Sequence, residues 1–181
     1  MPPSADSPTM FHPLVDQWFA ARYGAPSPAQ QLAWPAVAAG QNVLLLAPTG
    51  AGKTLAAFLY ALDQLITGAW PAGQTAVLYI SPLKALNNDI QRNLLQPLRE
   101  LRAAFAANGQ PFPAIRVATR SGDTTSTERR RLLQHPPEVL ITTPESLNLL
   151  LSTPSGQSAL AHLRTVILDE IHAVLPTKRG T

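Results

Sequence analysis

The chain has 181 residues, the size of one domain, and its 45% hydrophobic content is enough for a core, which excludes disorder throughout. It has no cysteine, which excludes a disulfide scaffold, a cysteine nucleophile and a thiolate metal site, and fits a cytoplasmic protein. A net charge of +3 permits a nucleic-acid partner without requiring one. No apolar run approaches the ~18 residues of a membrane span, so no membrane partner is expected. Residues 1–10 are expected to be disordered.

Apolar spacing predicts helices that alternate with strands along the rest of the chain. Helices are expected over 11–23, 28–40, 54–67, 83–108 (as one helix or two parted at Pro97), 127–134 and 145–151. Strands are expected over 42–47, 76–81, 115–119, 138–143 and 165–169. Short strands that are apolar on both faces favour an α/β fold with a doubly wound, mostly parallel sheet. Such a domain usually has a covering helix after its last strand, so we expect this one to be truncated at its C-terminal end.

Residues 47–54, Ala-Pro-Thr-Gly-Ala-Gly-Lys-Thr, follow an apolar strand pattern and precede a helical one. They match the phosphate-binding loop pattern except that Ala47 stands where the strict pattern has glycine. Glycines let backbone amides turn toward phosphate oxygens, the lysine supplies a positive charge, and the final hydroxyl is a hard ligand for Mg²⁺. The predicted nucleotide-binding residues of this loop are Thr49, Gly50, Ala51, Gly52, Lys53 and Thr54. A plain glycine turn with a solvated lysine is the alternative.

The last predicted strand ends in two carboxylates, Asp169 and Glu170. Carboxylates at the end of a buried strand are costly unless they meet a cation or hydrogen-bond donors. We expect Asp169 to hold Mg²⁺ together with Thr54, and Glu170 to orient or deprotonate an attacking water. His172 lies close enough in sequence to reach a bound phosphate, or it is a surface histidine. The alternative for the whole segment is a solvated strand end.

Three further loops follow predicted strands, where ligands of open α/β sheets gather. Their candidate nucleic-acid contacts are Pro82, Leu83, Lys84, Gly122, Asp123, Thr124, Thr143, Pro144 and Glu145. Each loop is also explained by ordinary capping, for example with Thr143 as the N-cap of a helix that opens with Pro144. The basic run Arg129–Arg131 points around its helix and favours a solvated face over a binding groove.

These motifs occur in the order found in the first RecA-like lobe of superfamily 2 DEAD/DEAH-box helicases. The details resemble most the large helicase-related (Lhr) group, through "SPLKALNNDI", "RSGDTTSTERRRL", "ITTPESLNLLL" and "DEIHAV". The resemblance covers about residues 11–180. It implies a P-loop NTPase lobe over residues 11–181 that binds ATP and Mg²⁺, with Lys53, Asp169 and Glu170 as catalytic residues.

The same resemblance implies that Gln30 reads the adenine through its amide, and that Phe11 or Tyr23 stacks on the base. It implies that the three loops line a track for one strand of DNA or RNA, and it makes DNA repair the first expectation for the pathway. Family members also carry a second lobe with an arginine finger and accessory domains, none of which lies in this sequence. An arginine finger is worth ~10³–10⁵ in rate, so this chain alone is expected to bind ATP and hardly hydrolyse it.

Two alternatives stay open. The chain could be a stand-alone module that binds nucleotide or nucleic acid without helicase activity. It could also be a different P-loop ATPase, which the glutamine at position 30 and the Thr-Thr-Pro-Glu-Ser-Leu segment argue against.

Overall fold

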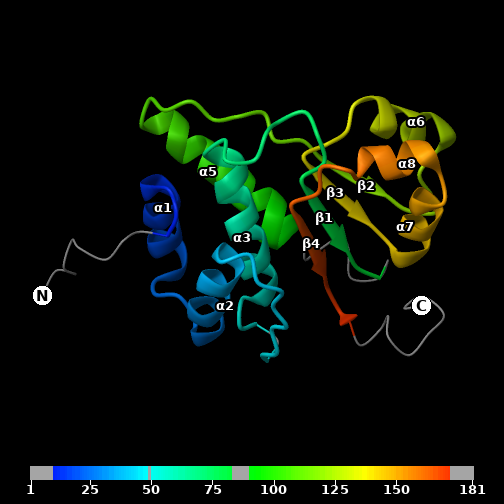
Figure 1. Ribbon diagram of the computed structural model, residues 1–181. Coiled ribbons are helices and arrows are strands. Elements are labelled where there is room, and N and C mark those ends of the chain that lie inside the picture. The colour runs from blue at the N-terminus through cyan, green and yellow to red at the C-terminus, as the bar shows by residue number, and fades with distance from the viewer. Residues whose placement is uncertain (1–9, 49, 83–89, 172–181) are drawn as a thin grey trace, which may run out of the picture.

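The structure, a computed structural model, describes residues 10–48, 50–82 and 90–171. The predicted disorder of residues 1–10 falls almost entirely outside this range. Figure 1 shows a central sheet between two groups of helices. The helices on one side are α1 (Pro13–Tyr23), α2 (Pro28–Ala38), α3 (Lys53–Ile66) and α5 (Gln96–Ala107). Those on the other side are α6 (Ser126–Gln134), α7 (Pro144–Leu151) and α8 (Pro154–Ala159).

The sheet of the described chain has four strands in the order β2-β3-β1-β4, and every pair is parallel. The strands are β1 (Val77–Ile80), β2 (Val117–Arg120), β3 (Val139–Thr142) and β4 (Thr165–Leu168). Because all pairs are parallel, the carboxyl ends of the four strands meet at one edge of the sheet. The expected α/β fold with a parallel, doubly wound sheet is therefore confirmed.

Successive side chains of a strand point to opposite faces of the sheet, so the core has two parts, one on each face. Val77, Tyr79, Val139 and Ile141 face the α3 and α5 side, where they join the larger apolar cluster. Leu78, Ile80 and Leu140 face the other side and pack with Leu150 of α7 and Leu160. Both faces of β1 and β3 are covered, which is why their sequences read as continuous apolar runs.

The prediction of a strand over 42–47 was wrong. These residues pair with no strand of the described sheet, and Val43, Leu44 and Leu46 are exposed by 40%, 69% and 80%. The physical reason is that a strand needs a neighbour for its backbone groups. In the described chain β4 is an edge strand that pairs only with β1, and its Val166 and Leu168 are half exposed. The apolar run 42–47 thus pairs with no strand, although one side of β4 is unpaired in the described chain.

The predicted helix over 83–108 is described only from residue 90 onward. It contains a π-helical turn, η2 (Gln91–Leu95), that continues directly into α5. Pro97 has no N–H, and its ring would collide with the carbonyl four residues earlier in an ideal α-helix. The wider π turn just before Pro97 relieves this conflict, so the proline neither ends the helix nor leaves it regular.

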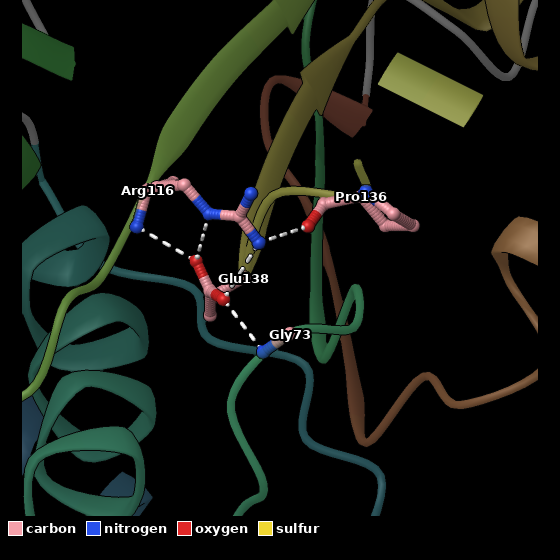
Figure 2. Close-up of polar contacts among 4 residues, drawn as sticks. All are labelled: Gly73, Arg116, Pro136 and Glu138. Carbon is pink, nitrogen blue, oxygen red and sulfur yellow. Dashed lines mark hydrogen bonds and ion pairs between the residues drawn. The ribbon is translucent and has the colours of Figure 1, made fainter. Parts of the chain in front are cut away.

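At the end of the sheet where the strands begin, opposite to their carboxyl ends, a buried carboxylate joins neighbouring segments of the chain. Glu138 is 2% exposed; its Oε1 accepts from the Gly73 N–H at 2.8 Å and its Oε2 from the Arg116 N–H at 2.8 Å. The Arg116 guanidinium adds bonds to both oxygens and reaches the Pro136 carbonyl at 2.7 Å (Figure 2). Burial raises the pKa of Glu138, but the bonds from Arg116 and Gly73 outweigh it and hold the pKa below its usual value.

The sequence patterns also missed one helix, α8, whose six residues carry serine, glycine and proline and too few apolar positions to show a period. Among the residues that the structure describes, no helix combines the length and the apolar character needed to cross a membrane.

Candidate nucleotide site

The loop that leads into α3 has the backbone conformation expected of a phosphate-binding loop. Gly50 and Gly52 have φ angles of +86° and +76°, which residues with a Cβ rarely adopt. Gly52 is also the N-cap of α3, and a Cβ added there would lie 2.6 Å from Nε2 of Gln30. Position 52 therefore favours glycine for its conformation, and a side chain there would also displace the Gln30 amide. Thr49 lies outside the described residues.

The loop rests on the first turn of α2. Ser27 and Gln30 form a capping box, in which Gln30 Oε1 accepts from the Ser27 N–H at 2.9 Å. Ser27 Oγ donates to the Ala51 carbonyl at 3.0 Å, and Gln30 Nε2 donates to the Gly52 carbonyl at 3.4 Å. Gln30 is 5% exposed. The residue expected to read adenine thus also holds the phosphate loop, a second role that the Ser-x-x-Gln spacing indicates only as a helix cap.

Lys53 opens α3, and its ammonium folds back on the loop. Nζ donates to the carbonyls of Ala47 and Pro48 at 2.5 and 3.0 Å. Thr54 follows on the first turn and is half-buried. The free amides of a helix start and a lysine charge lie together here, which is the arrangement that favours an anion.

The acidic residues lie where β4 ends. The Asp169 N–H donates to the Ile80 carbonyl of β1 at 2.9 Å, which extends the ladder by one residue. Its Oδ2 accepts from the Tyr79 hydroxyl at 2.5 Å, and its Oδ1 accepts from the Glu170 N–H at 2.9 Å. Glu170 has a φ of +50° and is the one non-glycine residue with positive φ in the described chain. Such strain is typical of functional sites.

Tyr79 is a site residue that sequence reasoning missed. It pairs in register with Ile167, so Asp169 is its diagonal neighbour on the same face of the sheet. A diagonal neighbour lies within reach of a long aromatic side chain. The ring is fully buried and packs 4.9 Å from the ring of Phe58 on α3. Only the register could have revealed this contact, because Tyr79 reads as one more apolar residue of a buried strand.

The residues present fit a magnesium nucleotide. Mg²⁺ prefers hard oxygen ligands and is usually held by one or two protein oxygens together with phosphates. The Thr54 hydroxyl and the Asp169 carboxylate are such donors, and Gly50 and Gly52 leave the loop free of side chains that would fill the phosphate position. In Figure 1 this loop and the tip of β4 lie at the same edge of the sheet.

The candidate nucleic-acid contacts also follow the carboxyl ends of strands, and the structure gives several of them structural tasks. Thr143 is buried and caps α7, accepting from the Ser146 N–H at 3.3 Å. Thr124 Oγ1 accepts from the Ser121 N–H at 2.9 Å. Gly122, Asp123 and Glu145 are exposed, whereas Pro82 and Pro144 are half-buried. Leu83, Lys84 and His172 lie outside the described residues.

The two rings expected to stack on a base lie in different surroundings. Phe11 is 6% exposed and packs edge-to-face on Trp34 at 4.8 Å, within the core. Tyr23 is 41% exposed and its ring lies under the Arg22 guanidinium. Trp18 and Phe19 also contact the Tyr23 ring, so Tyr23 is the more exposed of the two and is still packed by its neighbours.

Comparisons with known proteins show which family the chain is similar to. The model of the DEAD/DEAH box helicase family matches residues 27–181. An Lhr helicase of Mycolicibacterium smegmatis is 51% identical over 177 residues, which are 97% of this chain and 12% of that protein. The ATP-dependent helicase Lhr-Core protein 2 of Thermococcus barophilus is 46% identical over 92% of this chain and 20% of its own length.

A solved structure of the Mycobacterium smegmatis helicase Lhr bound to ssDNA and AMP-PNP is similar with a TM-score of 0.85 at 50% identity. The match covers 94% of this chain and 21% of that one, so the chain spans 12% to 21% of the length of these three proteins. The similarity confirms the RecA-like helicase lobe and the resemblance to Lhr-type helicases. On these matches, and on the loop and strand end described above, the chain belongs to the DEAD/DEAH box helicase family.

Proposed function

We propose that the chain is the first motor lobe of a helicase, that it binds ATP with Mg²⁺ through residues 49–54, and that Asp169 and Glu170 carry out hydrolysis in the intact protein. The observation that carries this proposal is the placement of the phosphate loop and the acidic end of β4 at one edge of a parallel sheet. Gly50 and Gly52 supply the cradle, and Thr54 and Asp169 supply the oxygen donors that Mg²⁺ prefers.

Each residue has a distinct task in this proposal. Bound Mg²⁺ would neutralise phosphate charge. Lys53 would exchange its two carbonyl acceptors for phosphate oxygens, because an anionic acceptor makes a stronger bond with an ammonium group than a neutral carbonyl does. Glu170, which is exposed and follows the end of β4, would orient or deprotonate the attacking water, and His172 is proposed to contact the phosphates.

The proposed track for nucleic acid runs over the same edge of the sheet. Strands β1, β2 and β3 all end there, and Gly122, Asp123 and Glu145, in the segments after β2 and β3, are exposed. The related Lhr structure carries ssDNA, which supports single-stranded DNA as the first substrate to test, with RNA as the second. Translocation on one strand with duplex unwinding is the proposed activity of the whole protein.

We further propose that the protein contains a second lobe and accessory helicase domains, because its relatives are five to eight times longer than the match. The exposed Val43, Leu44 and Leu46 and the open edge of β4 offer apolar surface for such parts. Without an arginine finger the 181-residue chain would bind ATP and hardly hydrolyse it. A role in DNA repair in the cytoplasm rests on the resemblance alone.

The test of adenine recognition uses two variants of the same capping box. Gln30→Ala removes the amide, whereas Ser27→Ala removes a hydroxyl that supports the same loop. If Gln30 reads adenine, Gln30→Ala loses the preference for ATP over GTP and Ser27→Ala keeps it. If both variants weaken ATP and GTP equally, Gln30 acts only through the loop. Competition of ATP and GTP for a fluorescent nucleotide measures the preference.

Hydrolysis is tested by comparing the 181-residue chain with the intact gene product. Nucleic-acid-stimulated turnover is expected in the intact product and not in the chain. Turnover of about one per second by the chain alone, the lower range of phosphoryl-transfer enzymes, would contradict the proposed need for further domains.

A further inference from the structure

Two arginines beside the loop after β2 lack an acceptor for their charge. Arg120 is the last residue of β2 and is 9% exposed. Its guanidinium makes no hydrogen bond or ion pair within residues 10–48, 50–82 and 90–171. Arg129 on α6 has a buried Nε without a partner, although its Nη2 donates to the Gly122 carbonyl at 2.9 Å. This bond fixes Arg129 against the loop that begins one residue after Arg120.

No carboxylate of the described residues forms an ion pair with Arg120 or Arg129. Arg120 pairs in register with Thr142, two residues beyond Leu140, so its side chain lies on the face of the sheet that α6 to α8 cover, and Arg129 of α6 is bonded to Gly122, two residues after Arg120. Burial lowers the pKa of Arg120, and the positive charge of Arg129 lowers it further. Glu128, on the same helix, is engaged by Thr125 through its hydroxyl and N–H. A buried cationic group without a counter-charge is costly, so Arg120 and the orphaned Nε of Arg129 at one loop need an explanation.

Arg129 also differs from its neighbours in the basic run. Arg130 and Arg131 are exposed and lie on the solvent side of α6, as the sequence led us to expect for the whole run. Arg129 is half-buried and turned toward the loop after β2. The run is therefore not one uniform solvated face, and Arg130 offers a control with the same charge on the same helix.

We propose that Arg120 and Arg129 together bind one phosphate group of a nucleic-acid backbone that passes over residues 122–124. A guanidinium group presents parallel N–H donors that match phosphate oxygens, and two such groups can share one phosphate. The unpaired Nε of Arg129 and the free guanidinium of Arg120 would receive these acceptors. The inference rests on the proposed track for nucleic acid and names two contacts that sequence reasoning had not assigned.

The test measures affinity for a single-stranded oligonucleotide over a series of salt concentrations, with the intact gene product saturated with AMP-PNP. Saturation keeps the phosphate loop occupied. Loss of one phosphate contact on a single strand should reduce the salt slope by about 0.7. The double variant Arg120→Gln/Arg129→Gln is expected to show this full reduction, and each single variant is expected to show part of it, because the remaining arginine still meets the same phosphate. Arg130→Gln is expected to retain the slope.

Equal slopes for Arg129→Gln and Arg130→Gln would overturn the inference. Arg129 decides the outcome even if Arg120→Gln fails to fold, because Arg129 lies on a surface helix. If the unaltered protein shows no salt-dependent binding of the oligonucleotide, the proposed function fails instead. If inorganic phosphate raises the Tm of the unaltered protein and of Arg129→Gln equally, the pair is not the phosphate site.

Discussion

A carboxylate lies at each end of the strands, Glu138 where they begin and Asp169 where β4 ends. The two carboxylates differ in the hydrogen bonds that they receive and in their burial. Glu138, where the strands begin, receives bonds on both oxygens from Arg116 and from the Gly73 N–H. Asp169, where β4 ends, receives one bond from another element, the Tyr79 hydroxyl, and one from the N–H of its own neighbour. Glu138 is buried, whereas Asp169 is half-buried and followed by an exposed, strained Glu170.

The two carboxylates therefore have different tasks: Glu138 stabilises the fold, and Asp169 is free to take part in the proposed reaction. A carboxylate saturated by donors joins segments together and has little capacity left for a ligand. A carboxylate with remaining lone pairs at an accessible edge can still accept a cation or a water. We expect changes around Glu138 to affect unfolding and changes around Asp169 to affect turnover.

The largest effect is expected at Glu170. Glu170→Gln keeps the size of the side chain and removes the group proposed to act on water, so the ATPase rate of the intact protein should fall by about 10²–10⁴. ATP binding and Tm should change little, because the side chain is exposed. Steady-state ATPase assays and nucleotide titrations measure the two properties. If ATP binding fell together with turnover, the proposal that Glu170 acts on the attacking water and not on nucleotide binding would be contradicted.

Glu138→Ala is expected to give the largest loss of stability. It removes the acceptor of the Gly73 and Arg116 N–H groups and of the Arg116 guanidinium, which should lower the free energy of unfolding by about 1–3 kcal/mol. Glu138→Gln, which keeps one acceptor oxygen, should lose less. Denaturant titration gives the values. If a folded Glu138 variant bound ATP more weakly than the unaltered protein, the end of the sheet where the strands begin would also influence the nucleotide site.

Tyr79→Phe removes only the hydroxyl that positions Asp169 and keeps the ring on Phe58. Residues that orient a metal ligand are typically worth about 10–100-fold in metal affinity or activity. We expect the Mg²⁺ concentration for half-maximal ATP binding to rise by about tenfold. Tyr60→Phe, at a half-buried ring beside Trp70, is the matched control and should behave like the unaltered protein. Identical Mg²⁺ dependence in both variants would remove Tyr79 from the site.

The smallest effect is a pH dependence. Because the pKa of Glu138 is held below its value in the unfolded chain, its stabilisation is present above about pH 4.5 and is lost as the pH falls through the folded pKa. Unfolding curves below pH 5 should therefore show a steeper loss for the unaltered protein than for Glu138→Gln. Parallel curves would mean that Glu138 has the same pKa in both states.

Much of this protein could be predicted from local pattern. The Gly-x-Gly-Lys-Thr loop and the Asp-Glu strand end were recognisable because the chemistry of phosphate and Mg²⁺ restricts which residues can stand there. Helices α1, α2, α3, α6 and α7 and strands β1, β3 and β4 lie within two residues of their predicted bounds. For all of them except α6, which has no buried residue, the apolar pattern matches the faces that they bury. Strand β2 begins two residues later than predicted.

Other features needed the tertiary structure. The run 42–47 has the composition of a buried strand, but it pairs with no strand among the described residues, although β4 has an unpaired edge there. The contact between Tyr79 and Asp169, and the approach of Arg129 to the loop after β2, join residues that no spacing in the sequence connects.

The sequence by itself determined the class of fold, because this depends on local periodicity, and it singled out candidate residues for a nucleotide through the chemistry of their side chains. The order of its motifs carried the resemblance to the family. Only the tertiary structure decided which carboxylate is saturated, which arginine lacks an acceptor and which apolar run stays exposed. These properties depend on partners that come from distant parts of the chain, and a partner exists only once the strands have taken their order and register.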